Sequence, residues 1–200
     1  MMKKFTQILG VIITSSMFST MMLYSGVANS STLGKLVDDF SHQTNNSLGL
    51  PRQFINDTTA GGKTNTTLTI SNGSMHQSGE IIPPRGQPGW ASSVLLLDAQ
   101  GLPKDLSQYE GITLLIKVRK GNLSVSANST EVTNFDYHAA PVMLIADEKF
   151  HEVKLPFSTM KRAWSEQTPL NTKTINSLSI VAYAMQKSSF DYQIREVSFY

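Results

Sequence analysis

The chain has 200 residues and carries 17 lysines and arginines against 15 aspartates and glutamates, a formal net charge of +2. Lys3 and Lys4 supply this excess, so the chain beyond residue 28 has as many basic as acidic side chains. A neutral chain with no basic stripe does not grip a phosphate backbone, and we expect no nucleic-acid partner. There is no cysteine, which excludes thiol catalysis, thiolate metal sites and disulfide bonds.

The first 28 residues have the layout of a secretory signal peptide. Their basic start is followed by an apolar run over residues 5–24 and by small residues that end at Ala28. Cleavage is expected after Ala28, with Ser30 as the alternative position. An uncleaved membrane anchor is the competing interpretation, because the run is just long enough to span a bilayer. Serines and threonines between residues 14 and 20 argue against that anchor.

This segment sets the expected organisation of the whole chain. We expect a signal peptide over residues 1–28, a loose polar lead-in over residues 29–35 and a single domain over residues 36–200. The protein is then exported, to the periplasm or to the outside of the cell, and has no membrane span after cleavage. The remaining chain of about 170 residues is long enough to bury a sizeable core.

Beyond the lead-in, hydrophobic residues recur with the period of two that is typical of strands. Asn72-Gly73 and Lys120-Gly121-Asn122 are turn sequences between such runs. Short helical turns are predicted over residues 103–109 and 158–164. The strands are expected over residues 67–71, 75–82, 92–97, 112–118, 123–127, 135–145, 151–156, 177–185 and 192–199. Strands at this spacing indicate an all-β, antiparallel sandwich or barrel. No glycine-rich loop opens a helix, so a nucleotide enzyme is not expected.

The order of several short motifs resembles that of a known family. The motifs are LVDDFS at residues 36–41, NDTTAGGKT at 56–64, DLSQYEGITLLIKV at 105–118, FDYHAAPV at 135–142, FHEVKLPFSTM at 150–160 and IREVSFY at 194–200. Together they resemble the complex I intermediate-associated protein 30 domain over residues 36–200. That resemblance implies a galactose-binding-like jelly-roll sandwich. The chain departs from the family pattern at Phe150, where a tryptophan is frequent, and at Asn56–Gly62, where the family often has an acidic-Met-Gly-Gly run.

The resemblance implies more than one function. Mitochondrial members of the family are assembly factors for respiratory complex I, a partner that an exported chain does not meet in the same way. Related modules bind glycans. The leading hypothesis is therefore a non-catalytic binding module for a glycan or another exported macromolecule. A protein-interaction or assembly factor is the alternative, and a glycan-active hydrolase or lyase on the same scaffold is the third.

A polar turn and an acidic cluster are the two places where calcium could bind. Asp57 with Gly61 and Gly62 could hold a cation or ligand, but a turn in which the carboxylate binds backbone N–H groups is the favoured interpretation. Asp38, Asp39 and Glu196 would meet if the first and last strands were neighbours, and could bind a structural calcium ion. Solvated charges at a strand edge are the favoured alternative there. No other cofactor is expected.

A sugar site would use aromatic side chains as flat platforms, with polar groups reading the hydroxyls. The predicted patch consists of Tyr137, His138 and Trp164, with Trp90 as a further exposed ring, and core packing is the alternative for such residues. The four histidines show no short metal-binding spacing, and no G-x-S-x-G motif accompanies them. Acidic residues are sparse in the central strands, so we assign no catalytic residue.

Overall fold

The computed structural model describes residues 33–200. The predicted signal peptide, and residues 29–32 of the predicted lead-in, lie outside the described residues. Within residues 33–200 no helix is long and apolar enough to cross a membrane. The end of the lead-in is attached to the fold, because the Leu33 carbonyl accepts a hydrogen bond from the Tyr109 hydroxyl at 2.7 Å. The Lys35 carbonyl accepts another from the Phe199 N–H at 2.8 Å.

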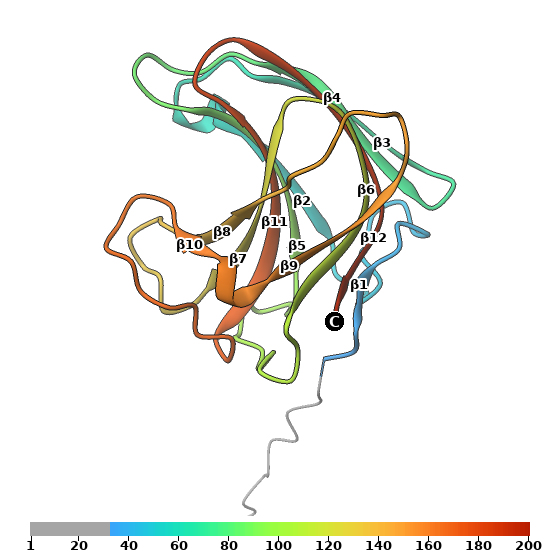
Figure 1. Cartoon of the computed structure of the whole chain (residues 1–200), viewed down its shortest axis with the longest axis vertical. Coiled ribbons are helices and arrows are strands. Elements are labelled where there is room, and N and C mark those ends of the chain that lie inside the picture. The colour runs from blue at the N-terminus through green and yellow to red at the C-terminus, as the bar shows by residue number, and fades with distance from the viewer. Residues whose placement is uncertain (1–32) are drawn as a thin grey trace, which may run out of the picture. The chain divides into compact units, whose positions relative to one another are not determined.

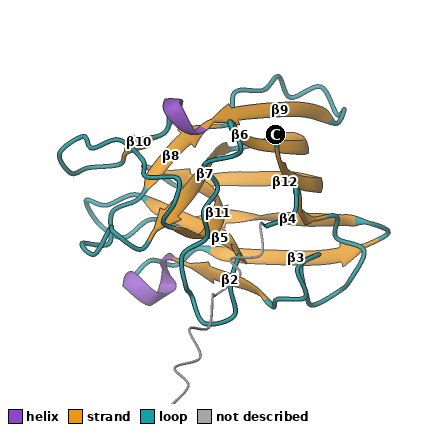
Figure 2. Cartoon of the chain, turned by 90° about the horizontal axis from the view of Figure 1, so that it is seen from below, coloured by secondary structure: helices purple, strands orange, loops and turns teal. Residues whose placement is uncertain are grey.

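Two antiparallel sheets form the two layers seen in Figures 1 and 2. The first sheet has the order β3 (Asn65–Ser71), β4 (Ser74–Ile81), β12 (Ser188–Phe199), β6 (Gly111–Lys120) and β9 (His151–Pro156), and β1 (Leu36–Asp38) also pairs with β12. The second sheet has the order β10 (Lys161–Arg162), β8 (His138–Pro141), β7 (Asn122–Ser129), β11 (Ile175–Ala184), β5 (Gly89–Leu96) and β2 (Arg52–Asn56). The prediction of an all-β antiparallel sandwich is confirmed.

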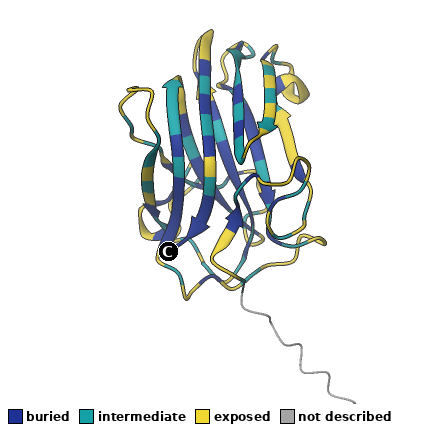
Figure 3. Ribbon diagram, turned by 90° about the vertical axis from the view of Figure 1, so that its right-hand side faces the viewer, coloured by how far each residue is buried: buried dark blue, intermediate teal, exposed yellow. Residues whose placement is uncertain are grey.

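The core lies between the two sheets, and Figure 3 shows the buried inner positions of the strands. It is filled by every second residue along the strands of both sheets, such as Leu114 and Ile116 on β6 and Leu178 and Ile180 on β11. One buried polar cluster joins the layers: the hydroxyls of Ser93 on β5 and of Tyr192 on β12 both donate to the Gln77 Oε1 atom on β4. Burial raises the pKa of the Tyr192 phenol well above its usual value, so this hydroxyl stays protonated.

The turn sequences predicted two connections between strands, of which one closes a hairpin. Asn72 and Gly73 both have positive φ, at 51° and 64°, and connect β3 to β4 as the turn sequence predicts. Gly121 has a φ of 89° and connects β6 of the first sheet to β7 of the second, so this turn crosses between the sheets and closes no hairpin. At Gly121 an added Cβ atom would lie 2.8 Å from the Phe190 Cβ atom, so the turn has no room for a side chain.

Other segments differ from the sequence prediction. Of the strand predicted over residues 135–145, only β8 forms. Phe135, with a φ of 61°, interrupts extended backbone before β8, and Pro141, which lacks an N–H group, ends the pairing. Residues 103–109 form no helix but contain one turn, in which the Tyr109 N–H donates to the Leu106 carbonyl at 2.9 Å. The turn predicted over 158–164 is reduced to the 3₁₀ helix η2 (Phe157–Thr159) before β10 begins. The short edge strands β2 and β10, and the 3₁₀ helix η1 (Asp57–Ala60), were not predicted.

Candidate functional site

The outer face of the second sheet carries small polar side chains in register. With Leu178, Ile180 and Ala182 of β11 buried in the core, the alternation of the strand places Ser177, Ser179, Val181 and Tyr183 on the opposite face. Their partners on the neighbouring strands share that face. These partners are Trp90, Ser92, Val94 and Leu96 on β5 and Asn122, Ser124, Ser126 and Asn128 on β7. We call these twelve residues the floor.

The floor contains fixed hydrogen-bonding groups and no carboxylate. The Asn128 side-chain amide donates to the hydroxyls of Ser177 and Ser179, at 3.1 and 2.8 Å. None of the six strands of the second sheet contains an aspartate or glutamate. The floor therefore offers hydroxyls and amides. These groups suit the binding of an uncharged polar ligand better than they suit acid–base catalysis.

Two aromatic rings stand at one end of the floor. Trp90 on β5 is the register partner of Tyr183 on β11, and Asn122 of β7 completes the same row. Tyr183 is 36% exposed although it lies on a central strand, and Trp90 is half-buried. An exposed aromatic ring within a polar sheet face is a platform for a flat apolar surface of a ligand.

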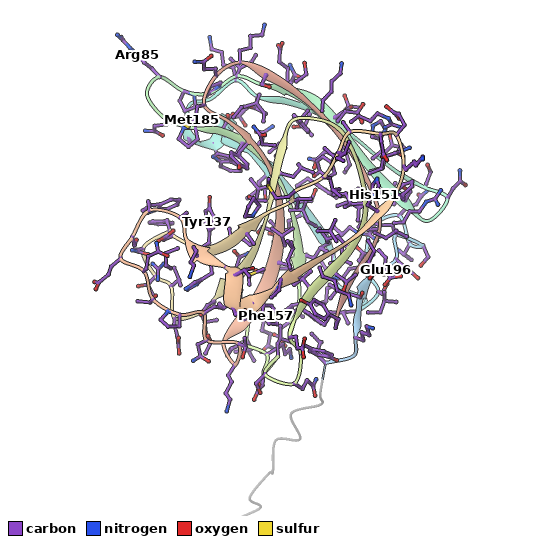
Figure 4. All side chains as sticks on the ribbon, viewed as in Figure 1. Arg85, Tyr137, His151, Phe157, Met185 and Glu196 are labelled. Carbon is purple, nitrogen blue, oxygen red and sulfur yellow. The ribbon has the colours of Figure 1, made fainter. Side chains whose placement is uncertain are left out.

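A second aromatic pair stands on the loops beside the sheet. The rings of Tyr137 and Trp164 meet edge to face, with centroids 5.3 Å apart and an interplanar angle of 85°. Trp164 is 61% exposed. Burial raises the pKa of the Tyr137 phenol above its usual value, and the nearby Asp136 and Tyr183 raise it further. Tyr137 directly precedes β8, the neighbour of β7 in the second sheet, and so lies beside the β7 edge of the floor. Figure 4 labels Tyr137 and Met185 on the same side of the view, with Tyr137 below Met185.

The structure does not bring His138 to the face of the predicted patch. His138 pairs with Ala127, which points into the core, and the imidazole is buried. Its Nε2 atom lies 2.8 Å from the Thr168 carbonyl oxygen, while its Nδ1 atom has no hydrogen-bond partner among the described residues. Because side chains alternate along a strand, two neighbours such as Tyr137 and His138 face opposite ways.

Asp57 holds a turn through three hydrogen bonds. The buried carboxylate accepts from the Thr64 N–H at 3.1 Å, the Thr64 hydroxyl at 2.7 Å and the Trp90 N–H at 3.1 Å. Gly61 ends η1 with a φ of 86°. Gly62 lies against the carboxylate, since a Cβ atom there would be 2.2 Å from the Asp57 Cγ atom. The carboxylate thus ties η1 to the segment that enters β3 and to the start of β5.

The predicted calcium ligands have other partners. Asp38 is buried and forms a two-point ion pair with Arg52, with Oδ2–Nε and Oδ1–Nη2 distances of 2.6 and 2.8 Å. Asp39 accepts from the Ser41 and Ser47 hydroxyls at 2.6 and 3.1 Å, and the hydrogen bonds from Ser41 lower its pKa. Over residues 33–200 no group of three or more His, Cys, Asp or Glu side chains is arranged to hold a metal ion. The first and last strands are neighbours, with Asp38 opposite Val197, but the calcium site that was the less favoured interpretation is not found among these residues. The favoured alternative of solvated charges is wrong for Asp38, which is buried by its pairing with Arg52.

An open cavity of about 450 Å³ lies elsewhere, along the loop between β8 and β9. Met143, Leu144, Ile145 and His151 line it. His151 is already bonded to Asp147 through Nε2 at 2.7 Å. With one engaged polar group and an otherwise apolar lining, the cavity has no convergent set of reactive side chains.

Residues 39–194 match the family model described as complex I intermediate-associated protein 30 (CIA30). The chain belongs to the CIA30 family. The match covers most of the described residues of this CIA30 domain, and it confirms the family resemblance of the sequence motifs. A search of curated protein sequences finds no match.

Solved structures similar to this CIA30 domain include carbohydrate-binding modules. One is the family 11 carbohydrate-binding module of the cellulosomal cellulase Lic26A-Cel5E of Clostridium thermocellum, with a TM-score of 0.58, 18% identity, and coverage of 84% of this chain and 95% of that one. Another is the Clostridium thermocellum module in complex with a β-1,3-1,4-mixed-linked tetrasaccharide, with a TM-score of 0.58, 18% identity and coverage of 82% and 94%.

An agarase, AgWH50C, is also similar, with a TM-score of 0.52 and 9% identity over 82% of this chain, which corresponds to 26% of the agarase chain. At these identities the likeness to the solved structures concerns the fold alone. It confirms the jelly-roll sandwich expected for the CIA30 domain.

Sequence reasoning missed Tyr183 and most of the floor. The alternation of serines with apolar residues in SLSIVAYA, residues 177–184, was the available signal. It identifies one polar face on this strand, but the partners of that face on β5 and β7 follow only from the register of the sheet.

Proposed function

We propose that this CIA30-family protein is an exported, non-catalytic module that binds a glycan on the outer face of its second sheet. The observation that carries the proposal is Tyr183, an exposed ring on a central strand amid a floor of hydroxyls and amides. The apolar CH face of a sugar packs on an aromatic ring, and its hydroxyls bond to small polar side chains. Tyr137 and Trp164 add a second platform at the side of the floor.

Similar solved structures add support of a weaker kind. The family 11 module with a bound mixed-linked tetrasaccharide shares the sandwich fold. For this chain it motivates β-linked glucans as the first ligands to test. The lack of acidic residues in the second sheet supports binding over hydrolysis, because glycosidases generally use a pair of carboxylates.

The test is a glycan-array screen with and without calcium, followed by calorimetric titration of the strongest ligand. Tyr183→Ala and Trp164→Ala are each expected to weaken binding roughly tenfold or more, the loss of one buried stacking contact. Phe150→Ala is the matched control. Phe150 is an aromatic residue in contact with Lys117 and Arg195 of the first sheet, and its loss should leave affinity unchanged. Absence of any glycan ligand at high protein concentration would overturn the proposal.

A further inference from the structure

One buried carboxylate, that of Asp136, receives four hydrogen bonds beside the Tyr137–Trp164 pair. Its Oδ1 atom accepts from the Tyr137 N–H at 2.8 Å and from the Ala163 N–H at 3.0 Å. Its Oδ2 atom accepts from the Arg162 Nε atom at 2.8 Å and from the Ser165 N–H at 3.0 Å. Both oxygens are therefore fully used by donors from two separate segments of the chain.

The positions of these donors matter more than their number. Ala163 and Ser165 are the neighbours of Trp164 on either side, so the carboxylate fixes the backbone before and after that ring. The third N–H belongs to Tyr137, the other member of the pair. A single side chain thus holds the main chain of both aromatic residues whose rings meet edge to face.

Other side chains close the same connection. The Arg162 Nη2 atom donates to the Asn134 side-chain oxygen at 3.0 Å, and the Asn134 amide donates to the Ser165 hydroxyl at 2.9 Å. The backbone ladder between the two segments is short, because β8 and β10 pair through two residues of each strand, and one further bond runs from the Ala163 N–H to the Tyr137 carbonyl at 3.2 Å. We call Asn134, Asp136, Arg162 and Ser165 the clasp, since their side chains join the segment before β8 to the segment after β10.

The clasp connects the two loops at a cost in folding free energy. Ion pairs that are removed from water gain little net stability over apolar packing. Phe135, inside the clasped segment, adopts a φ of 61°, which is unfavourable for a bulky side chain, and its ring is 93% exposed. Costs of this kind concentrate where a precise arrangement serves binding.

We propose that Asp136 is a positioning residue that holds Tyr137 and Trp164 in their binding arrangement before any ligand arrives. This inference rests on the proposed glycan-binding function. Ordering two loops and their aromatic side chains during binding would reduce affinity, and a pre-formed pair avoids that cost. The clasp does not contact the ligand in this account; it acts through the two rings.

The experiment compares Asp136→Asn with a matched control, Asp38→Asn, in protein expressed from the full-length sequence. Asp38 is also a buried carboxylate with a two-point arginine partner, but its partner is Arg52, away from the aromatic pair. Arg162→Gln is the second clasp variant, which leaves the Asp136 carboxylate and its three N–H donors in place. Three quantities are measured for each variant: thermal midpoint, acrylamide quenching of Trp164 in a Trp90→Phe background, and affinity for the glycan found on the array.

Both clasp variants should increase the quenching constant of Trp164 about twofold and weaken glycan affinity about tenfold, because the ring becomes mobile. Asp38→Asn should lower the thermal midpoint without changing either quantity. Unchanged quenching and affinity in both clasp variants would overturn the inference, as would equal losses of affinity in Asp38→Asn. If Trp164→Ala itself leaves binding intact, the proposed glycan site fails, whereas the quenching comparison still decides whether Asp136 positions the ring.

Discussion

Single carboxylates do much of the positioning in this protein. Asp57, Asp38 and Asp136 are all buried, and each is surrounded by N–H or guanidinium donors from distant parts of the chain. None of the three is exposed to a ligand. These carboxylates hold parts of the chain together, and the contacts proposed for a ligand come from aromatic, hydroxyl and amide groups.

Asp57→Ala should destabilise the protein by about 2–4 kcal/mol, because it leaves three buried donors without their acceptor. Urea unfolding followed by circular dichroism measures this free energy of unfolding. Thr58→Ala is the control, since Thr58 lies exposed in the same 3₁₀ helix. A loss below about 1 kcal/mol, the worth of one ordinary hydrogen bond, would contradict the role given to Asp57.

The two adjacent glycines should respond differently to alanine. At Gly61 a Cβ atom would meet nothing within 4 Å, so only the φ of 86° opposes it, a cost of about 1 kcal/mol. At Gly62 the Cβ atom would overlap the tied Asp57 carboxylate, and the cost should be clearly larger. Chemical denaturation of Gly61→Ala and Gly62→Ala gives the comparison. Equal losses would show that the Asp57 carboxylate can move aside.

At the scale of elements, the sequence predicted what local chemistry determines. The β3–β4 hairpin and the β6–β7 turn between the sheets follow from their turn residues, and the central strands follow from their alternation. The segment around Phe135 could not be predicted, because the Asp136 contacts with residues 162–165 replace the strand there. The strand β2 was not predicted for a different reason. Arg52 is buried by its pairing with Asp38, so RQFIN shows no alternation of polar and apolar residues.

The candidate site also has a part that the sequence predicted and a part that it did not. The exposed Trp164 and its neighbour Tyr137 were recognisable as aromatic residues in polar contexts. Their edge-to-face contact depends on two segments, before β8 and after β10, that the sequence alone does not bring together. His138 was predicted in the exposed patch but faces the core, because β8 begins at His138 and its pairing, not the sequence, decides whether Tyr137 or His138 points inward.

At the scale of the whole molecule, the two sheets present different surfaces. The first sheet carries charged side chains, among them Arg119 bonded to Asp191 and Glu148. The second sheet presents the uncharged floor. The sandwich thus has one face with charged side chains and one face of small polar groups and aromatic rings.

Acid stability should depend measurably on Asp136. Burial alone would raise the pKa of this carboxyl, but the hydrogen bonds from Arg162, Tyr137 and Ser165 outweigh burial and hold the pKa well below its usual range. A lowered pKa in the folded state means that the stabilisation is complete above about pH 4, the ordinary pKa of an aspartate, and is lost as the pH falls below it. Thermal midpoints between about pH 2 and pH 6 should fall less steeply toward acid in Asp136→Asn than in the wild type. Parallel curves would contradict this.

The central claim is that a glycan binds across Tyr183 and the floor around it. The most direct measurement is a calorimetric titration of wild type, Tyr183→Ala and Phe150→Ala with the strongest array ligand, each variant first shown to be folded. We expect saturable binding by the wild type and by Phe150→Ala, and roughly tenfold weaker binding by Tyr183→Ala. Equal affinity in all three proteins would contradict it.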